Sequence, residues 1–380
     1  MKYDLCIQNA HMIDPATKRN GRYHIWVHDG RIAKVISSDE HQVEGMTDAI
    51  EIILADEMIV TPGLIDLHVH VYEENTPSGI AADRIGVEQG VTTVVDAGSA
   101  GVDTFKNFVS QSIEPSRTEI LAWINISRQG FCDGRSELAD LSLLEPERTV
   151  ELVKKEKRII GIKARMSGSV VKQSGIVPLQ VAKKAARELG LPLMIHIGNA
   201  PPELFEILPL LDKGDVVTHA FHGKKGGIFT SDGTLLPEAQ EALERGVIFD
   251  VGHGTSSFSF RTMRLALSLG IKPKTISTDI YRQNFDGPVH SLPTTMSKLL
   301  ALGVSLEEVI EMTTSTPAQI LRRADQIGTM KEGTIADISL LKIVNEEITL
   351  TDSEKEEMIA HEYIQPVVTV KAGKVFTCYQ

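Results

Sequence analysis

The chain has 380 residues and a formal charge of −12, because 51 acidic side chains outnumber 39 basic ones. A negative field of this size repels phosphate backbones, and aromatic residues make up only 5%, so we exclude nucleic acid as a partner. Three scattered cysteines are too few for a disulfide framework. No run of about 18 apolar residues indicates a membrane span. We therefore expect a cytoplasmic globular protein without membrane contact.

The sequence pattern at both ends of the chain predicts short strands joined by turns. Near the start, His24–His28 and Arg31–Ile36 flank Asp29-Gly30, as the strands of a β-hairpin flank their turn. Residues 327–380 show the same pattern of short strands and turns. We predict that residues 1–58 and 327–380 pair into one small β-sandwich domain.

The middle of the chain, residues 59–326, alternates between strand-like and helix-like stretches, and many of the latter end in glycine. The apolar strand-like runs are Gly63–Val71, Val91–Asp96, Ile120–Ile126, Ile159–Met166, Pro192–Ile197, Val216–Phe221, Val247–Val251 and Thr275–Ile280. Eight such units predict an α/β fold, a closed parallel (β/α)8 barrel of the TIM type. A doubly wound open sheet is the alternative, but no glycine-rich dinucleotide loop follows the first strand.

Two histidines in the first of these strands suggest a metal site. His68 and His70 are two residues apart, so a regular strand places both on one face and Ile65, Leu67 and Val69 on the other. Two imidazoles that converge inside a barrel suit a divalent metal. Taken alone, the pair is weak evidence.

Other strands add polar side chains near their carboxyl ends, where barrel enzymes gather their catalytic groups. These residues are Lys163, His196, His219 and Asp279. A lone buried histidine is more often a satisfied core residue, and a lone strand-end aspartate is more often a helix cap. Their convergence from several strands at one level of a barrel instead predicts a catalytic centre.

With these residues in place, the sequence resembles the amidohydrolase superfamily. The resemblance covers nearly the whole chain and is carried by the entry motif Pro62–His70 and the closing motif Gly333–Ile338. In members with a lysine on the fourth strand, CO2 adds to that lysine and the carbamate bridges two metals. The resemblance implies two divalent metal ions, which we expect to be Zn²⁺. The first would be held by His68, His70 and Asp279, the second by His196 and His219, with carboxylated Lys163 between them.

Elementary chemistry agrees with this implication. A lysine within an apolar strand has a depressed pKa, so its free amine can attack CO2. The alternative for Lys163 is a buried salt bridge to an acid such as Asp96. A bridged metal pair would lower the pKa of a shared water, and Asp279 could take a proton from the resulting hydroxide and return it to the leaving group. We expect the hydrolysis of an amide or an ester.

Missing residues narrow the substrate. Dihydroorotase relatives have an arginine shortly after the His-x-His pair, and mononuclear nucleobase deaminases have a glutamate on the fifth strand, but neither is present here. The sequence is similar to a branch labelled dihydroorotase-like or adenine-deaminase-like, whose members resemble metal-dependent deacetylases. We expect removal of an acetyl or acyl group from a small carboxylate, either an N-acyl amino acid or an O-acetyl hydroxy acid.

Two other enzyme functions stay open: a cyclic amidase of the dihydroorotase or hydantoinase kind, and then a purine deaminase. A structural homologue without activity is disfavoured, because every candidate metal ligand is present.

Substrate contacts are expected around the rim. Arg165 lies two residues beyond Lys163 on the same face, where its guanidinium could bind a substrate carboxylate, the alternative being an ion pair with a loop acid. Further candidates are His222, His253, Tyr281 and Asn199. The loop Lys224–Gly227 could close over substrate. We expect the substrate to be a small molecule and the enzyme to form a homo-oligomer.

Overall fold

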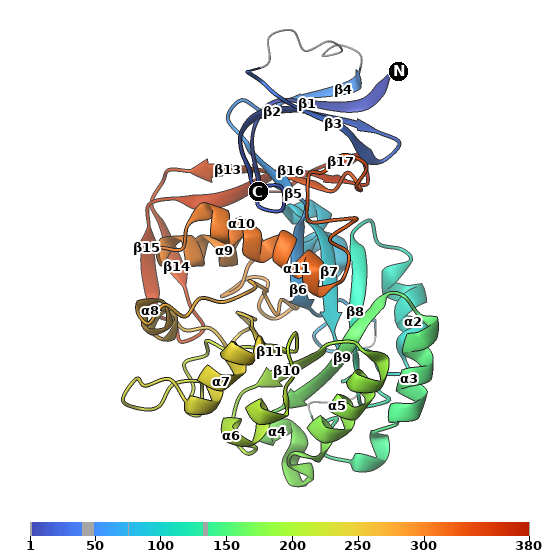
Figure 1. Ribbon diagram of the computed structural model, residues 1–380, viewed down its shortest axis with the longest axis vertical. Helices are drawn as coiled ribbons and strands as arrows, with labels where there is room; N and C mark the ends of the chain where they lie inside the picture. The colour runs from blue at the N-terminus through green and yellow to red at the C-terminus, as the bar shows by residue number, and fades with distance from the viewer. Residues whose placement is uncertain (1, 40–48, 75, 132–135, 380) are drawn as a thin grey trace.

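The computed structural model describes residues 2–39, 49–74, 76–131 and 136–379. Figure 1 shows a strand-rich part, where the blue and red ends of the chain meet, above a larger part in which strands are surrounded by helices. Within these described ranges, no helix is long and apolar enough to cross a lipid bilayer.

Both chain ends contribute to one eight-stranded sheet. Its strands are β1 (Tyr3–Asp14), β2 (Arg19–His28), β3 (Arg31–Ser37), β4 (Ala49–Leu54), β5 (Ile59–Pro62), β13 (Ile338–Val344), β16 (Tyr363–Lys371) and β17 (Lys374–Thr377). Strand β5 joins the two ends, because it runs parallel to β1 and antiparallel to β13. A strand-rich unit built from both ends is therefore confirmed, whereas its boundaries at residues 58 and 327 stay a prediction.

The second sheet is parallel and curls around the centre of the larger part. Its strands follow each other in chain order: β6 (Leu64–Val69), β7 (Val91–Ala97), β8 (Glu119–Asn125), β9 (Ile159–Met166), β10 (Leu193–Ile197), β11 (Val216–Thr218) and β12 (Ile248–Phe249). The predicted eighth strand, Thr275–Ile280, is reduced to a connecting segment. It forms one parallel bridge at Asp250 and another at Val69, and thereby closes the ring.

Helices cover the outside of this ring (Figure 1). They are α1 (Ala82–Ile85), α2 (Phe105–Phe108), α3 (Pro146–Lys155), α4 (Gly168–Val171), α5 (Val177–Leu189), α6 (Leu204–Ile207), α7 (Pro237–Arg245), α8 (Phe260–Ser268), α9 (Leu292–Ala301), α10 (Leu306–Thr313) and α11 (Ser315–Ile320). Helix α5 is an example of an amphipathic helix in this layer, because its buried residues include Leu179, Ala182 and Ala186. It ends at Gly190, which adopts the left-handed conformation with φ 62°. A late hairpin, β14 (Ile348–Thr351) and β15 (Glu357–Ala360), also packs on the barrel core.

One prediction about β6 is wrong. Ile65 and Leu67 pack in a cluster with Trp123, whereas Val69 packs in the cluster that joins strands to helices, so the three do not share a face. The register of β6 against β7 shifts between Asp66 and Val69. A register shift of this kind changes the face of the sheet on which the following side chains lie. A strict two-residue alternation of side chains does not predict it.

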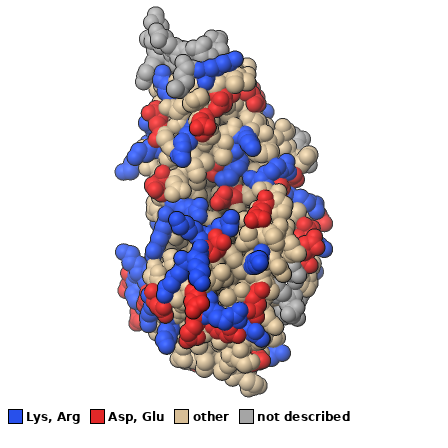
Figure 2. Space-filling view, turned by 90° about the vertical axis from the view of Figure 1, so that its right-hand side faces the viewer, with Lys and Arg blue, Asp and Glu red and all other residues tan. Residues whose placement is uncertain are grey.

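The surface near α3 and α5 carries charges of both signs. Figure 2 shows Lys and Arg gathered across the middle of this face, with Asp and Glu among and below them. Lys154 pairs with Glu188, and Arg158 pairs with Glu156. The basic residues at the end of α3, Lys154 and Lys155, thus lie at a solvated, partly paired helix end.

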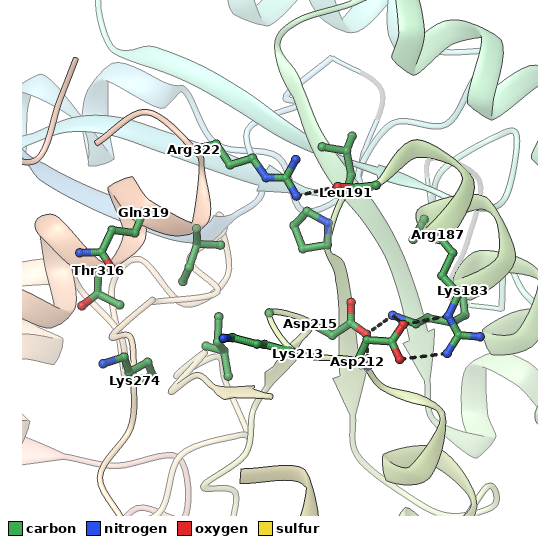
Figure 3. Close-up of a pocket in the computed structure, with 16 residues that line it drawn as sticks. Lys183, Arg187, Leu191, Asp212, Lys213, Asp215, Lys274, Thr316, Gln319 and Arg322 are labelled. Carbon is green, nitrogen blue, oxygen red and sulfur yellow. Dashed lines mark hydrogen bonds and ion pairs between the residues drawn. The ribbon is translucent and has the colours of Figure 1, made fainter. Parts of the chain in front are cut away.

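A cavity of about 500 Å³ lies at the amino-terminal end of the strands. Figure 3 shows Lys183 and Arg187 reaching Asp212 and Asp215 along one side of it. Asp215 is buried, pairs with Lys183, and accepts hydrogen bonds from the backbone N–H groups of Leu193 (2.9 Å) and Asp212 (2.7 Å). Here the charges bind one another, which indicates a structural role for this end of the barrel.

This cluster makes a stability prediction. Asp215→Ala removes one carboxylate from buried Lys183 and orphans two backbone donors, so we expect a loss of about 3 kcal/mol in the free energy of unfolding. Asp212→Ala is the control, since its half-exposed carboxylate should cost about 1 kcal/mol or less. Urea unfolding followed by circular dichroism measures both, and equal losses would contradict the assigned difference.

Candidate metal centre

A cavity of about 420 Å³ opens at the carboxyl ends of the barrel strands. Eight of the predicted site residues line it: His68, His70, Lys163, Arg165, His196, Asn199, Asp279 and Tyr281. His219 is fully buried next to it, and its ring centroid lies 4.4 Å from that of His196. The strands therefore bring all the candidate metal ligands together at one end of the barrel.

Asp279 is the centre of this group. Its Oδ1 lies 3.2 Å from His68 Nε2 and 3.1 Å from His70 Nε2, while its Oδ2 lies 3.8 Å from His219 Nε2. Ligand atoms of His68, His219 and Asp279 all lie within 4.8 Å of one another. This spacing suits the binding of a metal ion, and the group draws on both of the expected ligand sets.

The hydrogen bonds on the far side of each ring settle which nitrogen faces Asp279 with a lone pair. The Thr218 hydroxyl donates to Asp250 Oδ2 (2.7 Å), so it must accept from His68 Nδ1–H (2.9 Å). In the same way His219 Nδ1–H donates to the Gly252 carbonyl (2.5 Å). Both Nε2 atoms are therefore unprotonated acceptors, as a metal ligand requires.

Burial keeps these rings neutral. It lowers the pKa of His68 and His196 well below the ordinary value, and that of His219 to about 3. The Asp279 carboxylate lies among these rings, with Oδ1 3.2 Å from His68 Nε2 and 3.1 Å from His70 Nε2. A carboxylate thus faces imidazole lone pairs at short range. That arrangement is repulsive unless a cation lies between them, so the donor set fits a metal ion.

Lys163 is the second feature of this group that fits a metal site. It is 1% exposed, and its Nζ finds no hydrogen-bond partner among the described residues. Burial lowers its pKa to about 7. The alternative salt bridge to Asp96 is not formed, because that carboxylate accepts from the backbone N–H groups of Val71 (2.9 Å) and Ser99 (2.8 Å). A neutral amine next to metal ligands is the form that can react with CO2.

Two buried aspartates that the sequence analysis missed hold the segment that carries Asp279. Asp66 accepts from the backbone N–H of Thr278 (3.1 Å) and from its hydroxyl (2.5 Å). Asp250 accepts from the hydroxyls of Thr275 (2.7 Å) and Ser277 (2.6 Å). Burial raises the pKa of both carboxyls, that of Asp66 to about 7. The signal available in the sequence was a lone aspartate inside each of two apolar strands.

Glycines give the neighbouring loop room to approach this segment. A Cβ on Gly252 would lie 2.1 Å from Thr218 Oγ1, and one on Gly254 would lie 2.6 Å from Asp279 Oδ2. Both have positive φ, 49° and 53°. Larger residues at either position would displace the groups that orient the candidate ligands.

Arg165 is engaged by a loop acid. Its Nε donates to Glu137 Oε1 (2.7 Å), its Nη2 donates to Oε2 (2.6 Å), and its guanidinium stacks on Phe131 at 5.1 Å from the ring centroid. The alternative that we gave for this arginine is therefore the arrangement observed. Its contact with a substrate carboxylate stays a prediction.

The remaining rim candidates divide into two groups. Asn199 and Tyr281 line the cavity, and the Tyr281 hydroxyl lies 2.5 Å from Thr255 Oγ1. His222 lines a neighbouring cavity instead. His253 lines none of the cavities described here, and its Nε2 accepts from the buried ammonium group of Lys298 (2.8 Å). It is the middle residue of the Gly252–Gly254 turn, and its Nδ1 bonds the Gly254 carbonyl (2.9 Å), so its position argues for support of the loop.

Lys298 gives a prediction for stability against pH. Burial lowers its pKa from 10.5 to about 7, so between these pH values the unfolded chain binds a proton that the folded chain does not. Stability from this group therefore rises with pH over that window, by up to about 1.4 kcal/mol per unit. Urea unfolding at several pH values should show a slope in the wild type that falls by this amount in Lys298→Met. The contribution of Lys163, whose pKa burial also lowers to about 7, stays in both proteins.

The matched control for this pH series is Lys154→Met, which removes an exposed lysine from α3. Its slope should equal that of the wild type. A Lys298→Met profile parallel to the wild-type profile would show that Lys298 keeps its proton in the folded protein.

Comparisons with known proteins agree with this geometry. A deacetylase of Enterococcus faecalis is 40% identical over 99% of this chain and 100% of its own length, and one of Agrobacterium fabrum is 37% identical over 86% and 79%. Among solved structures, an adenine deaminase superposes with a TM-score of 0.91 at 38% identity over 99% of this chain and 100% of that one. A dihydroorotase superposes with a TM-score of 0.88 at 31% identity, over 98% and 99%.

The family model described as Amidohydrolase family matches residues 59–375, which include the barrel and every residue of the candidate metal centre. The barrel architecture and the predicted superfamily are both confirmed by these relatives. The chain belongs to the amidohydrolase family and is a hydrolytic enzyme that acts on amide or ester bonds.

Proposed function

We propose that this enzyme removes an acetyl or similar acyl group from a small acylated carboxylate, such as an N-acyl amino acid or an O-acetyl hydroxy acid. The observation that carries the proposal is the buried set of unprotonated imidazoles and a carboxylate around an unpartnered lysine. The relatives named deacetylases support the acyl group, because one of them matches this chain over its full length.

Two divalent cations fit the residues present. His68, His70 and Asp279 would hold one ion, and His196 and His219 the other, with Lys163 as a carbamate shared by both. The Nε2 of His219, which has no partner among the described residues, is an atom that such an ion would satisfy. The Nζ of Lys163, which likewise has none there, is the atom to which CO2 would add. When bound, the ions would supply Lewis acidity and an acidified water molecule.

The protein residues would then handle the proton. Asp279 lies at the cavity wall, so its carboxylate can accept a proton from the attacking water. It would return that proton to the nitrogen or oxygen of the leaving group. Asp66 and Asp250 keep its segment in place, and Thr218 keeps His68 in the tautomer that presents Nε2.

Opening of a cyclic amide is the second candidate, because a dihydroorotase structure superposes over nearly the whole chain. Purine deamination ranks after it, supported by the adenine deaminase structure. The sequence lacks the arginine after His70 that dihydroorotase relatives have. Zinc as the metal, a homo-oligomeric assembly and a cytoplasmic location stay predictions from the sequence.

A substrate panel tests the proposal. The enzyme is purified from cells grown with zinc and bicarbonate. Its kcat/KM for N-acetyl amino acids or O-acetyl hydroxy acids should be at least about 100-fold higher than that for dihydroorotate, hydantoin or adenine. Preferred turnover of a cyclic amide or of adenine would instead select one of the alternatives.

Lys163 provides the mutational test. Lys163→Ala removes the residue expected to join the two metal sites, so we expect activity to fall at least about 1,000-fold and bound metal to fall below two ions per chain. Elemental analysis and kcat measure these losses, and a short-chain carboxylic acid should restore part of the activity.

Lys183→Met serves as the control for this variant, because it removes a buried lysine from the opposite end of the barrel. It should lose stability but keep its metal content and KM. Full activity in Lys163→Ala would eliminate the carbamate.

A further inference from the structure

A second cavity, which we call the rim cavity, adjoins the metal centre. It has a volume of about 750 Å³ and lies between α6, the loop 223–235 and α8. Its apolar side chains are Leu204, Phe205, Ile228, Phe229, Leu236 and Leu265. Lys224 lines both this cavity and the cavity of the metal centre, so the two meet at that side chain.

His222 has an unused donor in the wall of the rim cavity. Its Nδ1 accepts from the backbone N–H of Lys224 (3.1 Å), so the neutral ring carries its proton on Nε2. The residue is 2% exposed, and Nε2 has no hydrogen-bond partner within the described residues. Burial and the charge of Lys224 lower the pKa of His222 to about 4, which keeps the ring neutral. A buried donor of this kind calls for an acceptor from a ligand.

Lys224 is the cation at the same boundary. Its exposed side chain makes no ion pair or hydrogen bond to any described residue. Desolvation lowers the pKa of its ammonium group, and the charge of Asp279 acts in the opposite direction. Two other cations nearby are occupied: Arg165 by Glu137, and Arg261 by Glu354 (3.6 Å) and the Gly223 carbonyl (3.2 Å). A third, Lys225, lines the rim cavity but not the cavity of the metal centre. Glu203 and Glu238 also line the rim cavity. Among the described residues, Lys224 is therefore the cation that lines the cavity of the metal centre without an ion-pair partner.

We propose that Lys224 and His222 together bind the carboxylate of the substrate, and that the rim cavity receives an apolar side chain on the leaving-group half. This assignment rests on the proposed function and names its substrate class: acyl derivatives of α-amino or α-hydroxy acids with large apolar side chains. The ammonium group and the imidazole N–H each donate to one carboxylate oxygen.

The reaction is compatible with this placement. Water adds across the bond between the acyl carbon and the nitrogen or oxygen of the leaving group. The hydroxyl stays with the acyl carbon at the metal centre, and a proton passes to the leaving atom. The freed amino or hydroxy acid already lies with its carboxylate and side chain in the rim cavity, outside the metal centre.

Kinetics with paired substrates test the carboxylate contact. Lys224→Met should raise KM for N-acetylleucine by about 10- to 100-fold and change kcat little, while kinetics with neutral N-acetylleucinamide should change less than about threefold. Lys213→Met makes the same charge change at the opposite end of the barrel and should leave both substrates unaffected. Equal effects of Lys224→Met on acid and amide would overturn the assignment.

His222 is tested by rescue. His222→Phe keeps the ring volume and removes the donor, so KM for the acid should rise about 3- to 10-fold, and His222→Gln should restore much of it. The rim cavity itself predicts that wild-type enzyme prefers N-acetylleucine over N-acetylglycine by at least about tenfold in kcat/KM. A preference for N-acetylglycine would exclude the apolar subsite.

Binding of a stable analogue separates this inference from the proposed reaction. The probe is the ketone isostere of N-acetylleucine, in which CH2 replaces the amide NH, compared with its primary carboxamide by calorimetry. Wild type should bind the acid at least about tenfold more tightly than the amide, and Lys224→Met should abolish that difference. If the panel shows no deacylation but this pattern holds, the proposed reaction fails and the carboxylate site stands. Equal binding of acid and amide by wild type would refute the site.

Discussion

The closure of the barrel by the segment Thr275–Ile280 is the constraint on which the rest of the site depends. The segment pairs with its neighbours through isolated bridges and backbone hydrogen bonds, and two buried carboxylates, Asp66 and Asp250, hold it further by accepting from its hydroxyls and from the Thr278 N–H. Their hold places Asp279 against His68, His70 and His219. The same Asp250 also orients His68 through Thr218. One buried network therefore both closes the fold and aims the candidate ligands.

Electrostatics divides the two ends of the barrel. At the amino-terminal end, Lys183 and Asp215 neutralise each other and the network is complete within the protein. At the carboxyl end, burial keeps the rings neutral and leaves Lys163 without a partner among the described residues, so this donor set fits added cations. A buried polar group without a partner costs free energy, which a bound group can recover. The residues that stabilise the barrel through ion pairs and the candidate metal ligands thus lie at opposite ends of the same strands.

The substrate side follows the same reasoning. Arg165 resembles a carboxylate clamp in the sequence, but its fork is occupied by Glu137, which comes from a loop at a distance of 28 residues along the chain. Lys224 lies in a stretch that reads as a flexible loop, yet it stands where two cavities meet. Whether a cation is available to a ligand is decided by its neighbours in space, which one sequence does not reveal.

The sequence by itself determined the family resemblance, the alternation of strands and helices, and the positions of the six candidate ligands, because these depend on local pattern and on residue type. It could not show that β6 shifts register, that the eighth strand is a bridging segment, or that Asp66 and Asp250 anchor it. Nor could it place His253 against Lys298 and away from the cavity. Those outcomes depend on contacts between residues far apart in the chain, where burial and the competition for each hydrogen bond are settled only once the barrel has closed.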